Sequence, residues 1–457
     1  MRASAWKCII GFTLLIVTAT PARLAAQQVQ QQRHYVVKDL GTFGGASGTA
    51  EGISDRGWVV GSANLAGDQN GHAFLWRDGV MTDLGTLGGP NSQEQWPVND
   101  NRGLIVGTAE TNAMDPFNEN FCGFAFNLGV PQTGLICLGF LWRDGVMTPL
   151  PTLGGNNSYA AGVNNRGQAV GWAENSTQDP TCLPPQMLDF EAVIWGPEQG
   201  DIQELPPLSG DTEAFATGIN DNGLVIGASG VCSNGSLPIH GVVWQDGMPT
   251  DLGNLGGVLN TLPWAINSRG QVVGNSDLAG DNNQPPLQPP PFHTFLWTKD
   301  SGMQDLGTLP GDFYSGAFGI NEQGQVVGGS CTQSFNLCRA FLWQNGVIAD
   351  VDALVMGPTS LHLWFANDIN SRGEIAAYAL DQSNGEFRAA LAIPCDDQHT
   401  DIPTCNETAA VAQTTATVTV APTTSGNPKV TLPENVRLML QRRLLRQNFA
   451  RNAATHK

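Results

Sequence analysis

Three acidic residues, Asp211, Glu213 and Asp312, stand in short glycine- and proline-containing segments and could do chemistry on a sugar. Two carboxyl groups that flank a glycosidic bond can cleave it, one as acid and the other as nucleophile or base. Acids in such segments more commonly only solvate a loop. The chain has no G-x-S-x-G, no H-E-x-x-H and no glycine-rich phosphate loop to complete another kind of active site.

Two similar oxygen-rich loops are candidate calcium sites, NLAGDQNGH at residues 64–72 and DLAGDNNQ at residues 277–284. Short loops of Asp and Asn with glycine can hold Ca²⁺. Neither loop matches a complete calcium-loop pattern, and the same residue types form turns without an ion. The candidate ligands, and the only cofactor that the sequence suggests, are calcium at Asn64, Asp68, Asn70, Asp277, Asp281 and Asn283.

Aromatic and histidine residues recur at fixed positions. The sequence places Trp96, Trp264 and Phe318 each three residues before an asparagine, with Trp364 nearby. They could form an aromatic collar for sugar rings or peptide, although large aromatic side chains more often fill a core. Three histidines stand four residues before a tryptophan in separate copies of one phrase, so they cannot converge on one metal. They are His72, His240 and His293.

These residues belong to a unit of four short segments that recurs along the chain. The first segment ends in Ile/Val-Asn, as in AAGVN (160–164), and a turn of the type N-x-R-G follows it. The second resembles QVVG, the third AFLW and the fourth VMTDLG, which leads into a TLGG connector. β-Branched and aromatic residues between glycine turns predict strands. The D-G or N-G dipeptide after AFLW predicts a two-residue hairpin.

Four strands cannot bury both faces of their sheet alone, and radial stacking of such sheets gives a β-propeller. The fourth segment occurs first as HYVVKDLG (34–41), before any first segment, and the last unit ends after its third segment. We therefore predict an all-β, seven-bladed β-propeller of four-stranded blades over residues 34–395. Its N-terminal strand should pair with residues 389–393 and complete the last blade, which leaves no long exposed edge. A β-solenoid would also repeat, but its coils lack a hairpin inside each unit.

The phrases HAFLW, DLGTLGG and GIN-x-x-GQVVG are similar to those of the HAF-repeat family of bacterial extracellular repeat proteins. The resemblance covers residues 35–393 and implies export, but it brings no established activity or catalytic residue. The seventh unit departs most, because Ala392 stands where the other units have tryptophan.

The segments between the second and third strands vary most in length, at residues 108–138, 174–189 and 275–291. Propeller topology puts these long loops on one face and the short turns on the other. Variable loops on a rigid scaffold are common binding sites, so a ligand is predicted on the long-loop face. Most cysteines fall there too, with Cys122–Cys137, Cys182–Cys232 and Cys331–Cys338 as expected pairs. The full disulfide set is Cys122, Cys137, Cys182, Cys232, Cys331, Cys338, Cys395 and Cys405.

The ends of the chain have a different composition. Residues 1–26 resemble a signal peptide, residues 396–432 form a Thr/Ala-rich linker, and residues 433–457 form a basic, helix-prone tail. No later segment is apolar enough to span a membrane. We therefore expect a secreted protein, extracellular or periplasmic, that is monomeric.

The formal charge of −19 excludes nucleic acid as a partner, because nucleic acid requires a cationic surface. The repeat carries no isolated catalytic cluster. The sequence therefore favours a non-catalytic binding or structural module with a glycan or protein ligand, and the alternative is a secreted glycan-active hydrolase or lyase that uses carboxylates at the channel mouth.

Overall fold

The computed structural model describes residues 34–94, 102–119, 121–124, 128–180, 182, 186–198, 200–232, 239–280, 290–399 and 405. The predicted signal peptide, nearly all of the linker and the basic tail lie outside these residues. Among the described residues, no helix is both long and apolar enough to cross a membrane.

The described chain is all-β and forms successive sets of four strands. The first sets are β2 (Gly44–Ile53), β3 (Val59–Leu65), β4 (Gly71–Arg77) and β5 (Val80–Asp83); β6 (Gly88–Gln93), β7 (Ile105–Met114), β8 (Leu135–Arg143) and β9 (Val146–Pro149); and β10 (Gly154–Val163), β11 (Ala169–Gln178), β12 (Leu188–Trp195) and β13 (Ile202–Leu205). Next come β14 (Glu213–Ile219), β15 (Val225–Gly230), β16 (His240–Gln245) and β17 (Met248–Asp251); then β18 (Gly256–Ile266), β19 (Val272–Leu278), β20 (Phe292–Thr298) and β21 (Gly302–Gly307). The last are β22 (Tyr314–Ile320), β23 (Val326–Cys331), β24 (Cys338–Gln344) and β25 (Val347–Asp350), a 3₁₀ helix (Asp352–Leu354), then β26 (Leu361–Ile369), β27 (Ile375–Asp381) and β28 (Glu386–Pro394), with β1 (Tyr35–Gly41) beside β28.

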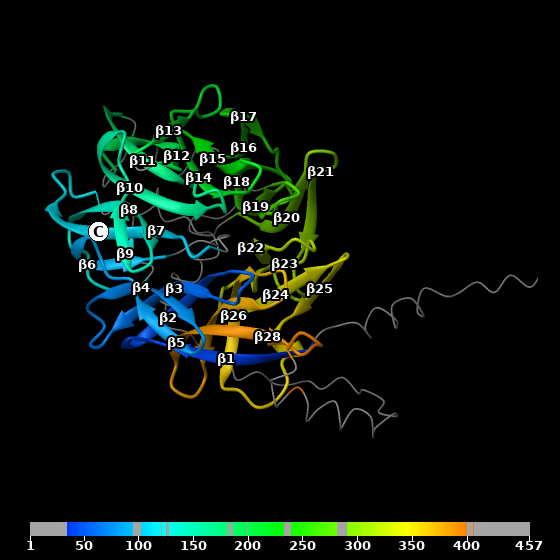
Figure 1. Cartoon of the computed structure of the whole chain (residues 1–457). Helices are drawn as coiled ribbons and strands as arrows, with labels where there is room; N and C mark the ends of the chain where they lie inside the picture. The colour runs from blue at the N-terminus through cyan, green and yellow to red at the C-terminus, as the bar shows by residue number, and fades with distance from the viewer. Residues whose placement is uncertain are drawn as a thin grey trace, which may run out of the picture.

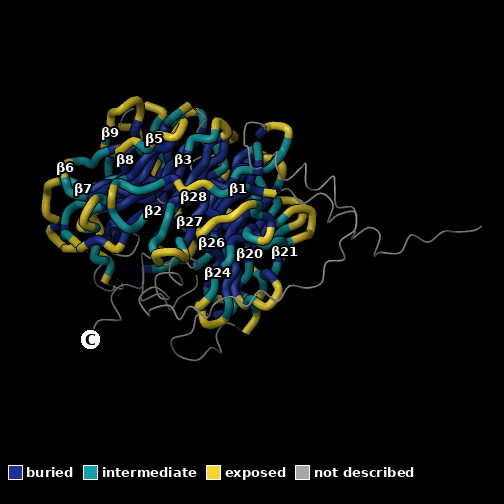
Figure 2. Tube along the Cα trace, turned by 90° about the horizontal axis from the view of Figure 1, so that it is seen from below, coloured by how far each residue is buried: buried dark blue, intermediate teal, exposed yellow. Residues whose placement is uncertain are grey.

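Within each set the strands pair antiparallel in the order of the sequence. Figure 1 shows the sets side by side around a common centre. The first strands contact one another in the order β10, β14, β18, β22, β26 and β2, so the last set of the chain lies against the first. The buried residues lie along the strands, and the exposed ones gather in the loops at their ends (Figure 2).

Glycine ends the QVVG phrases for a steric reason. The first strands of five sets carry a bulge opposite this glycine, for example between Ala160 and Gly162 and between Ala317 and Gly319, and the last set carries one opposite Ala377. A Cβ on Gly171 would lie 1.9 Å from the carbonyl oxygen of Tyr159. No side chain fits at that distance, so glycine is required at position 171.

The predicted hairpins are confirmed in their backbone geometry. Asp78 and Gly79 have φ of 51° and 84°, and Asn345 and Gly346 have φ of 51° and 82°. Positive φ at both central residues defines the turn that matches the twist of the flanking strands. These hairpins place the fourth strand of their sets at the outer edge, whereas the last set receives β1 there.

The N-terminal strand closes the last set, as the sequence predicts. Strand β1 pairs antiparallel with β28, with Val37 opposite Ala392 and Val36 opposite Ile393. A single parallel pair, Ser47 with Phe387, joins β2 to β28, so strands from both ends of the described chain share one sheet.

All the predicted cysteine pairs are present as disulfides. Cys122 is bonded to Cys137 and Cys331 to Cys338, each within one set of strands. Cys182–Cys232 ties the segment before β12 to the segment after β15 in the next set, and Cys395–Cys405 lies after β28. These bonds agree with an oxidising compartment.

Removal of β1 tests the closure. Deletion of residues 34–41 leaves the backbone groups of β28 unpaired, and an unpaired edge promotes association. We expect a lower Tm and soluble aggregates in size-exclusion chromatography with light scattering. Deletion of residues 433–457 is the control and should change neither. A monomeric Δ34–41 protein with the parent Tm would contradict the role of β1.

Candidate functional site: a pocket inside a ring of asparagines

In five sets the asparagine at the end of the first strand links its own turn to the neighbouring set, and in the first set Ser54 occupies this position. The Oδ1 atom of Asn220 accepts the backbone N–H groups of Asn222 at 3.0 Å and Leu224 at 3.1 Å. Its Nδ2 donates to the backbone carbonyl of Asn267, in the next set, at 3.0 Å. One buried amide therefore stabilises a tight turn and an interface between two sheets.

The same contact repeats around the centre of the molecule. Amide Nδ2 atoms donate to the carbonyl oxygen one set further on at distances of 3.0–3.2 Å, in the pairs Asn164 to Asn220, Asn267 to Asn321, Asn321 to Asn370, and Asn370 to Ser54. The last pair joins the final set to the first. Asn99, the corresponding residue of the second set, lies outside the described residues.

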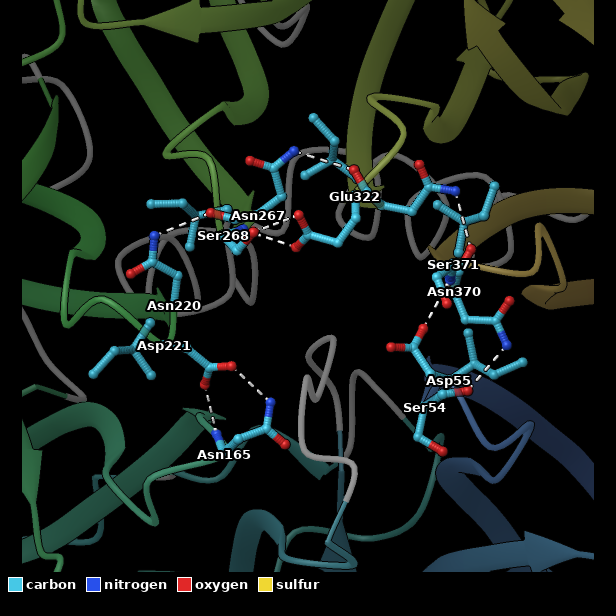
Figure 3. A pocket seen from close by; sticks show the side chains of 16 residues that line it. Ser54, Asp55, Asn165, Asn220, Asp221, Asn267, Ser268, Glu322, Asn370 and Ser371 are labelled. Carbon is cyan, nitrogen blue, oxygen red and sulfur yellow. Dashed lines mark hydrogen bonds between the residues drawn. The ribbon is translucent and has the colours of Figure 1, made fainter.

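This asparagine ring surrounds a pocket of about 270 Å³ on the face of the short turns (Figure 3). Its apolar part is a set of isoleucines that precede the ring, Ile53, Ile219, Ile266, Ile320 and Ile369. Its rim is made by the residue after each ring position, namely Asp55, Asn165, Asp221, Ser268, Glu322 and Ser371.

Neighbouring sets hold the three rim carboxylates in place. Asp221 accepts the backbone N–H and the Nδ2 of Asn165, both at 2.8 Å. Glu322 accepts the backbone N–H of Ser268 at 2.8 Å and its hydroxyl at 2.5 Å. Asp55 accepts the backbone N–H of Ser371 at 2.8 Å. These hydrogen bonds fix the three carboxylates at the rim.

The lining therefore offers hydrogen-bond acceptors and negative charge. Lys, Arg and His are absent from the residues that line the described pocket. Without a positive charge the pocket is poorly suited to an anion. It suits a small ligand that donates hydrogen bonds, such as a hydroxyl, an ammonium or a guanidinium group.

The predicted aromatic collar lies in the interior. Trp264 and Phe318 are each 1% exposed and Trp364 is 2% exposed, within one core cluster that also contains Phe365 and Tyr378. Trp96 lies outside the described residues. The burial of the other three favours core packing, the alternative already open from the sequence, over contact with a ligand.

The three acids of the hydrolase alternative have separate local partners. Asp211 accepts the hydroxyl of Ser229 at 2.6 Å, and Asp312 pairs with Arg339 at 2.9 Å. Glu213 is buried and accepts a hydrogen bond from the side chain of Gln186. All three acids are thus held in local polar contacts.

The candidate calcium loop at residues 64–72 is held by its own hydrogen bonds. Asp68 accepts the Nδ2 of Asn64 at 3.2 Å and the backbone N–H of Ala46 at 2.8 Å. Asn70 contributes its backbone carbonyl to a turn bond from Leu65 N. In the second loop Asp277 accepts the Nδ2 of Asn260 at 2.9 Å, and Asp281 and Asn283 lie outside the described residues. Calcium at these residues stays a prediction.

The histidines of the HAF phrases bind the aspartates of the DLG phrases across the third and fourth strands. His72 Nδ1 lies 2.8 Å from Asp83, and His293 Nδ1 lies 3.0 Å from Asp305. Burial alone would raise the pKa of Asp83, but hydrogen bonds from His72 and from Gly85 N outweigh it and lower that pKa. The co-occurrence of the two phrases in one unit thus has a structural cause.

The long-loop face contains buried carboxyl groups that sequence reasoning missed. Glu174 accepts hydrogen bonds from the backbone and side chain of Asn157, whose Nδ2 also contacts Asp115 at 3.2 Å. Burial, together with the nearby Glu119 carboxylate, raises the pKa of Glu174 from 4.5 to about 8. Burial also raises the pKa of Glu119. The signal in the sequence was the GWAE segment at residues 171–174, in which an acidic residue stands among the buried positions of a strand.

No protein-family model and no curated protein matches the chain. Solved structures similar to it include dipeptidyl peptidase 4 of Porphyromonas gingivalis, with a TM-score of 0.31, 9% identity, and coverage of 78% of this chain and 46% of the peptidase chain. Another is the Trypanosoma rangeli sialidase in complex with sialic acid, with a TM-score of 0.38, 13% identity, and coverage of 74% of this chain and 58% of the sialidase chain. The chain thus spans less than two thirds of either protein, and the architecture rests on the strand pairing described above.

Substitution of a ring asparagine tests the energetic weight of the ring. Asn267→Ala removes two donated bonds, to Gln271 and to the Asn321 carbonyl, and leaves buried polar groups unpaired. We expect a loss of about 2–4 kcal/mol in urea denaturation. Asn254→Ala is the control, because Asn254 is exposed and bonds only its own turn at Gly256 N; it should cost less than about 1 kcal/mol. Equal losses would show that the ring adds nothing beyond its turns.

The raised pKa of Glu174 predicts a pH dependence. Because the folded state keeps this proton up to about pH 8 whereas the unfolded chain releases it near 4.5, stability should fall as pH rises between these values. We expect a loss on the order of 2–4 kcal/mol in metal-free buffer. Glu174→Gln, which resembles the protonated form, should flatten the profile of unfolding free energy against pH. A profile as steep in the variant as in the parent would disprove the assignment.

Proposed function

We propose that the chain is an exported, closed, seven-bladed β-propeller of the HAF-repeat type and that it acts as a non-catalytic binding module. Seven sets of four strands among the described residues, with β1 as the outer strand of the last, support this count. The disulfides and the expected signal peptide support export.

The pocket inside the asparagine ring carries the proposal of binding. Rim carboxylates from three different sets, Asp55, Asp221 and Glu322, stand around one apolar floor. An apolar floor with a few fixed polar groups is typical of small-ligand sites. The proposed ligand is a neutral or cationic group rich in hydrogen-bond donors, such as a sugar with free hydroxyl or amino groups or a basic side chain of a protein.

This site lies on the short-turn face, whereas the sequence favours the long-loop face. Both faces belong to the same proposed module. Several long-loop residues, including 183–185, 233–238 and 281–289, lie outside the described chain, so the long-loop face stays a second prediction from the sequence.

Rim substitutions test this function. The mature protein is screened on an array of neutral, amino and acidic glycans and of lysine-containing peptides, and calorimetry follows with the strongest binder. Asp221→Asn and Glu322→Gln remove charge-assisted hydrogen bonds, each worth about 1.5–3 kcal/mol, so each should weaken binding about tenfold or more.

Asp300→Asn, at an exposed hairpin, is the matched control and should bind as the parent does. Binding confined to acidic glycans, or binding that both rim variants retain, would refute the pocket as the site. Turnover of a bound glycan by the parent protein would refute the non-catalytic role.

A further inference from the structure

A long part of the chain contains many acidic residues but no lysine or arginine. Residues 167–268 contain 12 Asp and Glu residues and no Lys or Arg. Most of these acids can face water, where their charge costs little. Those that are buried cannot find a protein cation nearby in sequence, so their neutralisation needs another source.

Three of these acids are buried at one interface between neighbouring sets. Asp189 and Glu191 are alternate residues of β12 and therefore point to the same face of the sheet. Glu213 is the first residue of β14, the strand that packs against β12. Their exposed fractions are 7%, 8% and 7%.

The carboxyl groups of Asp189 and Glu213 are close enough to share one ion. One oxygen of Asp189, one oxygen of Glu213 and the sulfurs of Cys182 and Cys232 all lie within 4.8 Å of one another. The two sulfurs form the disulfide that ties the segments on either side. Because both sulfurs are in this disulfide, the ligands available to an ion are the carboxylate oxygens.

Glu191 supplies an independent sign that a ligand is missing. Its Oε2 atom is buried and has no hydrogen-bond partner among the described residues. Glu191 lies two residues from Asp189 on the same face of β12, beside the other two acids. A buried carboxylate oxygen without a partner costs free energy that a bound cation would recover.

We propose that Asp189, Glu191 and Glu213 form a binding site for a hard divalent cation, with Ca²⁺ as the best fit. Three carboxylates can supply up to six oxygens, and calcium takes six to eight oxygen ligands in flexible geometry. The ion would join β12 to β14 and so connect two adjacent sheets on the long-loop side. It is independent of the asparagine-ring pocket and differs from both candidate calcium loops.

Protons are the competing source of neutralisation. Burial and the nearby Asp179 carboxylate raise the pKa of Asp189 to about 6. Burial and the carboxylates of Glu204 and Asp189 raise that of Glu191 to about 8. A cation that displaces these protons should bind more tightly at pH 8 than at pH 5, whereas protons alone would give no response to calcium.

The test is calorimetric titration of CaCl₂ into the mature, oxidised, metal-free protein at pH 8, with Tm measured in calcium and in a chelator. The parent should bind calcium and gain at least about 3 °C in Tm. Asp189→Asn and Glu213→Gln should each weaken binding tenfold or more. Asp68→Asn tests the first candidate loop separately: calcium binding that is lost in this variant and kept in Asp189→Asn would belong to that loop and would overturn the proposed site.

Asp246→Asn is the matched control. Asp246 is an exposed hairpin residue of the same acidic part of the chain, and Asn345 already occupies the equivalent turn. If Asp189→Asn or Glu213→Gln fails to fold, Glu191→Gln replaces it, because Oε2 of Glu191 has no hydrogen bond to lose. Any of three results would overturn the site: the parent binds no calcium, the three site variants retain the binding, or Zn²⁺ binds only after reduction of Cys182–Cys232.

Discussion

The buried asparagine amide at the end of five of the first strands is the contact on which this architecture depends. Its carbonyl oxygen closes a turn within one set of strands, and its NH₂ group reaches the backbone of the next. A side chain with both a donor and an acceptor is needed, and neither Asp nor Leu could replace it. The bonds that the amide oxygen accepts come from residues at most four positions away in the sequence. The bond that the NH₂ group donates reaches a residue about fifty positions away, so the repeated turns are joined into a ring.

The ring also separates two kinds of interior. On the short-turn side the rim is polar and the centre is open over an isoleucine floor. On the other side aromatic side chains such as Trp264, Phe318 and Tyr378 fill the interior. Aromatic packing supplies stability in the interior, whereas hydrogen-bonded amides and carboxylates order the pocket.

Much of the fold could be predicted from the sequence, because it is written in local signals. Asp78-Gly79 specifies a hairpin, the displaced segment HYVVKDLG specifies a closing strand, and the cysteine spacing within one loop specifies Cys331–Cys338. The pocket could not be predicted in this way. Asp221 and Glu322 look like ordinary turn residues, and only the ring brings them together. The burial of Glu191 and Glu213 likewise depends on a neighbouring sheet that no local pattern reveals.

The bond from Asn370 to the Ser54 carbonyl spans 316 residues of sequence. A chain that emerges N-terminus first, as it does during synthesis, presents β1 long before β28 exists. The early sheets can assemble on one another as they appear, but the circle cannot be completed until nearly the whole repeat region is available. The final step of maturation is therefore a loop closure with a large entropic cost. A truncated chain would remain an open arc whose two exposed ends promote association.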